Sequence, residues 1–418
     1  MKKWKKTLAA IALLFWAAPL LAGQFRAGAA KVEITPQMST PLAGYGERQG
    51  KSSEGVMDPI YSRSLVLDDG SKKIAIVAND ILLVLADMKQ EIESNVSDLK
   101  LDGILLTATH THSGPGGYSD ILAVKIAVMG KYVPEYRKFL LAQISRSIRE
   151  AERSMQPAQF GSRVAQAPGY AVNRRHRDAS PPAVVDPALG LVKITDLKGK
   201  TIAYLVNYAG HPTVLPPSNL KISGDYAGVL EREIEDKDPG AIALFCPGPL
   251  GDQGPNCGLN EDKLVCMNRL GQGLAAEAWK NFPSIDPTGQ VKINIFDQMV
   301  DMPAVKFKKE CWVGIKWLMK RAGKNLIRQK AELMAVQLND TLIYGAGAEL
   351  AVEVGFQLKA LHPGQKQMVF VHANDWLGYL LTPEDYNTGG YEACMELYGS
   401  GFEPYLVERF QEMTAGVQ

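Results

Sequence analysis

The sequence predicts a mixed α/β (α+β) fold in which β-sheets are flanked by helices, within one domain over residues 24–418. Strand-like runs and helical spacing are mixed along the chain without a regular βα repeat. No internal repeat, low-complexity tract or flexible linker divides the 418 residues. Hydrophobic residues make up 46% and charged residues 22% of the sequence, which is typical of a globular protein with a large core.

The N-terminal residues have the pattern of a targeting segment. Lysines up to Lys6 precede an apolar run over residues 7–21, and Ala22 followed by Gly23 offers a small-residue cleavage point. This run is short for a membrane span, which needs about 20 apolar residues. We therefore expect residues 1–23 to be a cleaved signal peptide and the mature protein to be periplasmic or secreted. A retained N-terminal anchor is the alternative.

Strands and helices are expected in order along the mature chain. The strand segments are bounded by Gly or Pro turns or are short buried runs, and they are 25–36, 65–69, 74–78, 103–109, 191–194, 202–207, 241–246, 333–337, 341–344 and 368–372. The helical segments have apolar residues at helical spacing, and they are 89–99, 135–153, 227–234, 263–279, 352–361 and the C-terminal residues. Residues 306–329 form a basic amphipathic stretch, which predicts a surface helix packed on the body. The alternative is a patch that contacts membranes transiently.

Charge and cysteine content narrow the partners. The net charge is +1, so no basic excess favours nucleic acid as a partner. The five cysteines contain no Cys-x-x-Cys pair of the kind that binds metals, and their odd number leaves at least one without an intrachain partner. Cys257 and Cys266 are the closest pair in the sequence.

Two histidines follow a predicted buried strand at the start of a Gly/Pro-rich loop, His110-Thr-His-Ser-Gly-Pro-Gly-Gly117. On a strand, residues two apart face the same side, so His110 and His112 are expected to point together. Imidazole is a common zinc ligand, and glycines let the backbone approach a ligand closely. This is the strongest local signal of a metal site in the chain. A pair of structural histidines is the alternative.

A second strand also ends in a histidine, His211, which Pro212 follows. Alone it is as consistent with a structural histidine as with a ligand, but it offers another imidazole from another strand end. Asp225 is either a carboxylate that orients a ligand histidine or a plain turn residue. The Gly/Pro loop at 245–256 favours an ordinary turn. From its local pattern alone Glu349 fits a surface carboxylate, and residues 374–386 could line a substrate site.

Several short strings together resemble the catalytic domain of the neutral/alkaline, non-lysosomal ceramidases, from about Ala27 to Phe402. The most specific is His110-Thr-His-Ser-Gly-Pro. Each of the other strings is weak evidence by itself, but together they occur in the order found in that family. They are Gly28-Ala-Ala-Lys-Val-Glu-Ile-Thr35, Asn173-Arg174, His211-Pro-Thr213, Ser223-Gly-Asp225, Gly251-Asp252, Pro255-Asn256, Gly378-Tyr379, Thr382-Pro383 and Tyr391-Glu392. The resemblance implies the mixed α/β fold of that catalytic domain.

The resemblance also implies a ligand set for one Zn²⁺ per chain: His110, His211, Glu349 and Tyr379. It implies that His112, Arg174 and Tyr391 act on the substrate. Two departures stand out. Gly347-Ala348 precedes Glu349 where the family has Pro-Gly, and Gly254 occupies the place of a family serine. From the resemblance we also expect the chain to stop near the end of the catalytic domain, without the further C-terminal domain of these ceramidases.

The expected function is a zinc-dependent hydrolysis of amide bonds in N-acyl lipid or small-molecule substrates, and so a place in sphingolipid metabolism. A metal can activate water for direct attack, so the missing serine is not chemically obligatory. Two alternatives remain. One is a zinc hydrolase of esters, lactones or peptides on the same scaffold. The other is a non-catalytic zinc- or lipid-binding relative, which Gly254 favours.

Overall fold

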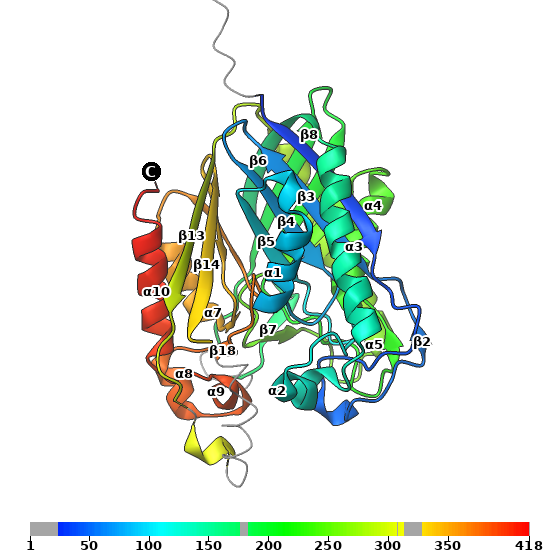
Figure 1. Cartoon of the computed structure of the whole chain (residues 1–418), viewed down its shortest axis with the longest axis vertical. Helices are drawn as coiled ribbons and strands as arrows, with labels where there is room; N and C mark the ends of the chain where they lie inside the picture. Colours follow the sequence, from blue (N-terminus) through cyan, green and yellow to red (C-terminus); the bar gives the residue numbers. More distant parts are fainter. Residues whose placement is uncertain (1–23, 176–182, 307, 313–327, 418) are drawn as a thin grey trace, which may run out of the picture.

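Two β-sheets lie face to face in the computed structural model, which describes residues 24–175, 183–306, 308–312 and 328–417 (Figure 1). The larger sheet has eight strands in the order β11-β9-β8-β6-β1-β3-β4-β5. These strands are β1 (Arg26–Glu33), β3 (Tyr61–Asp68), β4 (Lys73–Asn79), β5 (Gly103–Ala108), β6 (Gln156–Gln166), β8 (Ala188–Asp196), β9 (Thr201–Tyr208) and β11 (Ile242–Pro247).

The smaller sheet has four strands in the order β13-β14-β15-β17. They are β13 (Ile293–Asp301), β14 (Lys330–Leu338), β15 (Thr341–Gly345) and β17 (Lys366–Phe370). Three two-stranded sheets supply short strands elsewhere in the fold: β2 (Gly55–Val56) with β10 (Lys221–Ile222), β7 (Ala171–Asn173) with β12 (Gln253–Pro255), and β16 (Glu349–Leu350) with β18 (Tyr379–Leu380).

The facing surfaces of the two sheets form one layer of the core. Leu65 and Leu67 of β3 point into this layer and pack with Met334, Ile343 and Phe370 of the smaller sheet. Val66, between the two leucines, points to the opposite face and joins a different cluster, because successive side chains of a strand alternate. The central strands are therefore buried on both faces, which explains why their sequences read as short continuous apolar runs.

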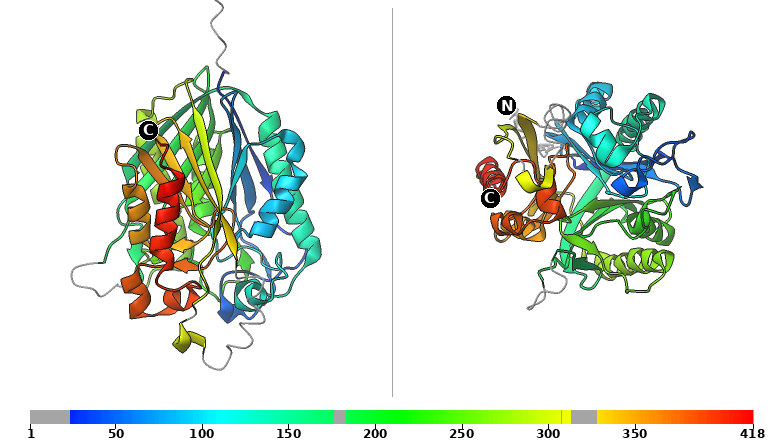
Figure 2. Two further views of the ribbon diagram at one scale, coloured as in Figure 1. Left: turned by 60° about the vertical axis from the view of Figure 1, so that its left-hand side comes forward. Right: turned by 90° about the horizontal axis from the view of Figure 1, so that it is seen from below.

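Helices cover the outer faces of both sheets (Figure 2). α1 (Ala86–Asn95) and α3 (Pro134–Arg153) lie on one half of the larger sheet, and α4 (Asp225–Lys237) and α5 (Lys263–Asn281) on the other. α7 (Val352–Ala360) and α10 (Phe402–Met413) cover the smaller sheet. The contact of α3 with β1 is so close that a Cβ at Gly28 would lie 2.2 Å from the carbonyl oxygen of Ala151.

Two asparagines tie the sheets together near the ends of their strands. The Asn207 side chain on β9 donates to the carbonyl oxygens of Cys246 and Val369. The Asn374 side chain accepts from the Leu106 amide of β5 at 2.9 Å. The loops that follow β5, β9 and β17 therefore leave the two sheets at fixed relative positions. Shorter elements, α2 (Leu122–Val124), α8 (Pro383–Thr388) and α9 (Tyr391–Met395), gather with β18 at the lower end of the view in Figure 1.

The predicted fold class, sheets flanked by helices, is confirmed, and the predicted segments match observed elements with shifted ends. β6 and β13 were not predicted, because polar residues interrupt the apolar patterns of Gln156–Gln166 and Ile293–Asp301. The placement of His110 and His112 on a strand is wrong. β5 ends at Ala108, and His110 has the left-handed backbone angle φ +65°. The predicted signal peptide lies outside the described residues, as does most of the stretch 306–329.

Two disulfides join cysteines of the described residues. Cys257 bonds to Cys266, the pair closest in the sequence, and Cys311 bonds to Cys394. Cys246 is buried and forms no disulfide. Within residues 24–175, 183–306, 308–312 and 328–417, no helix combines the length and the apolar character that crossing a bilayer would require.

Candidate metal centre

Loops from both sheets bring together three imidazoles and one carboxylate. His110 and His112 follow β5, and His211 follows β9. Glu349 begins β16, which pairs in parallel with β18 so that Glu349 lies opposite Tyr379. A hydrogen bond from the His112 amide to the Pro212 carbonyl, 3.2 Å long, ties the two histidine loops to each other.

The donor atoms lie at the separations that a small cation requires. Oε2 of Glu349 is 3.5 Å from Nε2 of His110 and 3.3 Å from Nε2 of His211. Ligands about 2.1 Å from a tetrahedral metal ion lie about 3.4 Å from one another. His110, His211 and Glu349 are at most 3% exposed, so these atoms meet away from solvent. The arrangement fits a divalent cation of zinc size.

Backbone carbonyls orient both buried imidazoles. Nδ1 of His110 is 2.7 Å from the Leu82 oxygen, and Nδ1 of His211 is 2.5 Å from the Leu250 oxygen. A carbonyl only accepts, so each Nδ1 carries the proton and each Nε2 presents a lone pair to the site. Asp225 does not perform this task. It begins α4, and its carboxylate accepts from the amides of Leu215 and Tyr226, so it is neither a partner of a ligand histidine nor a turn residue.

Glu349 is buried, so the interpretation of its local pattern as a surface carboxylate is wrong. The indole of Trp376 donates to its Oε1 at 3.0 Å and leaves Oε2 facing the histidines. Burial alone would raise the pKa of this carboxyl, but His110 and His211 hold it well below its usual value. Burial, with a smaller effect of Arg174, lowers the pKa of His211 to about 3. At neutral pH the carboxyl of Glu349 is therefore anionic and the imidazole of His211 is neutral.

His112 lies at the edge of this cluster, partly buried. Its Nε2 is 3.2 Å from Nε2 of His110. Burial, together with His110 and His211, holds the pKa of His112 well below its usual value. The His112 ring packs against Gly44, where a Cβ would lie 2.6 Å from the ring and the backbone φ is +101°. Only glycine therefore fits at position 44 without moving His112.

Arg174, Tyr379 and Tyr391 form a second group of side chains, next to Glu349. Nη2 of Arg174 donates to the Tyr379 hydroxyl at 3.0 Å and to the Gly251 carbonyl at 2.8 Å, and its Nε pairs with Glu392 at 2.9 Å. Burial raises the pKa of Tyr379 well above its usual value, and the charge of Glu349 adds to this. The ring of Tyr391 is 5.9 Å from that of Tyr379 and is 59% exposed.

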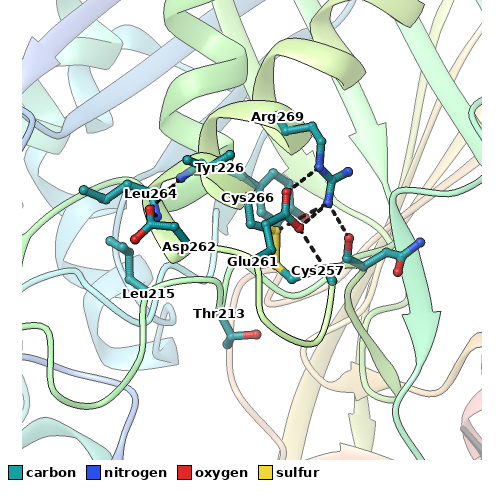
Figure 3. Close-up of a disulfide and its surroundings, with 12 residues drawn as sticks. Thr213, Leu215, Tyr226, Cys257, Glu261, Asp262, Leu264, Cys266 and Arg269 are labelled. Carbon is teal, nitrogen blue, oxygen red and sulfur yellow. Dashed lines mark hydrogen bonds and ion pairs between the residues drawn. A yellow bond between two sulfur atoms is a disulfide. The ribbon is translucent and has the colours of Figure 1, made fainter.

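A cavity of about 290 Å³ opens beside Arg174, between Thr213 and the segment that runs from Gly254 to Leu259. Gly254 lies in β12, and the disulfide Cys257–Cys266 fastens the loop after it to α5 (Figure 3). Glu261 in this loop accepts from the guanidinium of Arg269 at 2.8 Å. The position that would carry the family's serine therefore lines a cavity next to a predicted site residue.

His372 is a site residue that the sequence analysis missed. It lies two residues beyond β17, and its ring stacks on that of His110 with 3.9 Å between the ring centres and 17° between the planes. Its ligand atoms lie within 4.8 Å of those of His110 and Glu349. A single histidine at the end of an apolar strand, Met368-Val-Phe-Val-His372, carries no motif that distinguishes it from a core residue.

The model of the family described as neutral/alkaline non-lysosomal ceramidase, N-terminal, matches residues 25–271, more than half of the chain. The chain belongs to this ceramidase family. Its relatives include the neutral ceramidase of Mycobacterium tuberculosis, 28% identical over 242 residues, which are 51% of this chain and 38% of that protein. Neutral ceramidase A of Dictyostelium discoideum is 26% identical over 295 residues, 63% of this chain and 41% of that one.

The crystal structure of the neutral ceramidase from Pseudomonas aeruginosa has the same fold. It superposes with a TM-score of 0.81 over 94% of this chain and 74% of that chain, at 19% identity. A structure described as ceramidase complexed with C2 superposes with a TM-score of 0.80 at 17% identity. The matched segments span only about two fifths of the curated ceramidases, so family membership leaves the activity of this chain to be argued from its own site.

Proposed function

We propose that this chain is an exported, zinc-dependent hydrolase that cleaves the amide bond of N-acyl substrates of the N-acylsphingosine type. The observation that carries the proposal is that three buried donor atoms lie together, with Oε2 of Glu349 3.5 Å from Nε2 of His110 and 3.3 Å from Nε2 of His211. The curated relatives that bear the name neutral ceramidase support the choice of an amide substrate.

The proposed metal ligands are His110, His211, Glu349 and Tyr379. Nitrogen and carboxylate ligands that leave a position open for water are typical of catalytic zinc. Bound there, zinc would lower the pKa of water to about 7 and polarise the substrate carbonyl. The register that sets Glu349 opposite Tyr379 supports the inclusion of the tyrosine. In the absence of a metal the Tyr379 phenol is the weakest of the four donors, because burial raises its pKa and favours the protonated form.

His112 is the proposed acid and base. Its Nε2 lies 3.2 Å from Nε2 of His110, next to the proposed metal position, and burial keeps the imidazole unprotonated at neutral pH by lowering its pKa. It would take the proton from water as the water oxygen bonds to the carbonyl carbon. It would return a proton to the nitrogen as the C–N bond breaks, so that acid and free amine leave.

Arg174 and Tyr391 are proposed to hold the substrate. Arg174 already spans Tyr379, Gly251 and Glu392, so its guanidinium is fixed at the mouth of the cluster. Exposed Tyr391 offers a hydroxyl and an apolar ring at the same mouth. Fixed donors of this kind mainly orient the substrate carbonyl for attack, and they contribute less to the affinity of the protein for the substrate.

Water, rather than a side chain, is the proposed nucleophile, since Gly254 has no hydroxyl. The same position also supports a second candidate function, a non-catalytic zinc- or lipid-binding protein. Purified protein should be tested on a panel of fluorogenic N-acyl amides, esters, lactones and peptides, with and without a chelator. Chelator-sensitive amide turnover supports the proposal, and preference for esters or lactones would reassign the substrate. Zinc binding without turnover, both in the wild type and in Gly254→Ser, would favour the non-catalytic binding protein.

Export is proposed from the first 23 residues. N-terminal sequencing of the protein recovered from the cell envelope and the medium tests it. The proposal expects a mature chain that begins near Gly23 or Gln24, whereas an intact Met1 in the membrane fraction would indicate a retained anchor.

A further inference from the structure

The backbone around His372 is held on three sides. The Val371 amide donates to Pro247 at 3.0 Å, the Ala373 amide to Ala346 at 3.1 Å, and the Asn374 amide to Leu106 at 2.8 Å. Between these contacts His372 adopts φ +52°, a left-handed conformation that residues other than glycine enter at a cost. Surroundings that fix such a conformation also fix where the side chain goes. Here they direct it onto the ring of His110.

The ring of His372 makes its contact through its face. It is fully buried and lies nearly parallel to His110, 3.9 Å away. His112 and His211 meet His110 differently, with their ring planes inclined at 82° and 68° to it. Neither nitrogen of His372 has a hydrogen-bond partner among the described residues. Hydrogen bonding to the protein therefore does not explain a histidine at this position.

The stacked geometry also argues against His372 as a ligand of the same ion. An imidazole binds a metal close to its own ring plane, at about 2.1 Å from nitrogen. An ion in the plane of His110 lies roughly one ring spacing out of the plane of His372. The lone pairs of two parallel rings do not converge, so one ion cannot serve both.

We propose that His372 is a positioning residue, which holds the plane of the His110 imidazole by stacking and thereby raises the affinity of the site for its metal. The proposal rests on the metal site of the proposed function. Leu82 fixes one edge of the His110 ring through Nδ1, and this contact alone leaves the ring free to tilt about that bond. The flat face of His372 blocks the tilt. Outer partners of metal-bound histidines commonly contribute 10- to 100-fold in metal affinity, and we expect a change of about tenfold here.

Two replacements of similar apolar character separate stacking from simple filling of space. His372→Leu fills the position without a flat face, whereas His372→Phe keeps one. His362→Leu is the matched control, since His362 bonds to Thr414 at the C-terminal end of α10. Zinc affinity is measured by competition with a chromophoric chelator. We expect about a tenfold loss in His372→Leu, recovery to within about threefold in His372→Phe, and no change in the control.

Equal losses in the leucine and phenylalanine variants would overturn the proposal and point to a ligand. Unchanged affinity in His372→Leu would overturn it as well. If the phenylalanine variant does not fold, a second measurement replaces it. Pulsed electron paramagnetic resonance counts the imidazoles bound to Cu²⁺ in the wild type and in His372→Leu. The proposal requires the same number of coordinated imidazoles in both, and one fewer in the variant contradicts it. A wild type that binds no metal would refute the proposed function itself, an outcome distinct from all of these.

Discussion

Oε2 of Glu349 lies 3.3 Å from Nε2 of His211, although the two residues follow strands of different sheets. His211 follows β9 of the eight-stranded sheet, and Glu349 follows β15 of the four-stranded sheet. An ion held by both would cross-link the sheets. Metal binding should then be visible in the stability of the whole protein, as well as in its activity.

Zinc is predicted to raise the melting temperature. A ligand that binds only the folded state at 100 times its dissociation constant stabilises that state by about 2.7 kcal/mol. Differential scanning calorimetry of chelator-treated protein, before and after addition of zinc, measures the effect. Magnesium serves as the control, because it prefers an all-oxygen octahedral site. Coincident melts with and without zinc would contradict a cross-linking site.

Trp376→Phe is predicted to weaken metal binding by about 10- to 100-fold while the fold is retained. The change removes the indole N–H that donates to Oε1 of Glu349 and keeps the aromatic volume. Trp279→Phe is the matched control, because the Trp279 indole nitrogen has no hydrogen-bond partner among the described residues. Chelator competition measures both affinities. A loss of equal size in the two variants would show that Glu349 gains nothing from its indole partner.

Arg174→Lys is predicted to lower kcat/KM for an N-acyl amide by about 100-fold and to leave zinc stoichiometry unchanged. A lysine ammonium cannot reproduce the planar contacts with Tyr379, Gly251 and Glu392 at once. Arg232→Lys, at the ion pair with Asp58, controls for the loss of a guanidinium elsewhere. Steady-state kinetics and metal analysis of the same preparations test the prediction. Loss of zinc together with activity would show instead that Arg174 holds the metal ligands in position.

Lowering the pH is predicted to destabilise the metal-free protein at pH values at which His211 of the folded protein is still unprotonated. The pKa of His211 is about 3 when folded, against 6.5 for the ordinary side chain. Between these values the unfolded chain binds more protons, so the free energy of unfolding falls as the pH falls through this window. His211 alone accounts for about 2 kcal/mol between pH 7.5 and pH 5. Urea titrations at the two pH values measure it, and equal midpoints would contradict the buried, neutral state of this imidazole.

The fold class could be predicted from the sequence, and so could most of the side chains that the structure brings together at the candidate site, for different reasons. Strands buried on both faces give short apolar runs, so β3, β4, β5 and β11 could be predicted from these runs and the turns that bound them. His110 and His112 stood out because a Gly-rich loop follows them. Glu349 and Tyr379 carried no local signal of their own. They entered through resemblance to a family, and only the parallel pairing of β16 with β18 shows why they lie together.

The groups that orient the ligands could not be predicted. Backbone carbonyls of Leu82 and Leu250 hold the two histidines, and every residue has a carbonyl, so no sequence pattern marks them. The carboxylate of Asp225, which the sequence offered for this task, instead accepts from the amides of Leu215 and Tyr226 at the start of α4. His372 reaches the site because three distant segments hold its backbone, and such convergence is a property of the tertiary structure.

The most direct test of the account is the zinc content of the purified mature protein and of its His110→Ala variant, measured by mass spectrometry after gel filtration. His362→Ala is the control for loss of a histidine elsewhere. We predict about one zinc per chain in the wild type and the control, and almost none in His110→Ala. A wild type without bound metal, or full stoichiometry in His110→Ala, would contradict the assignment of this cluster as the metal centre.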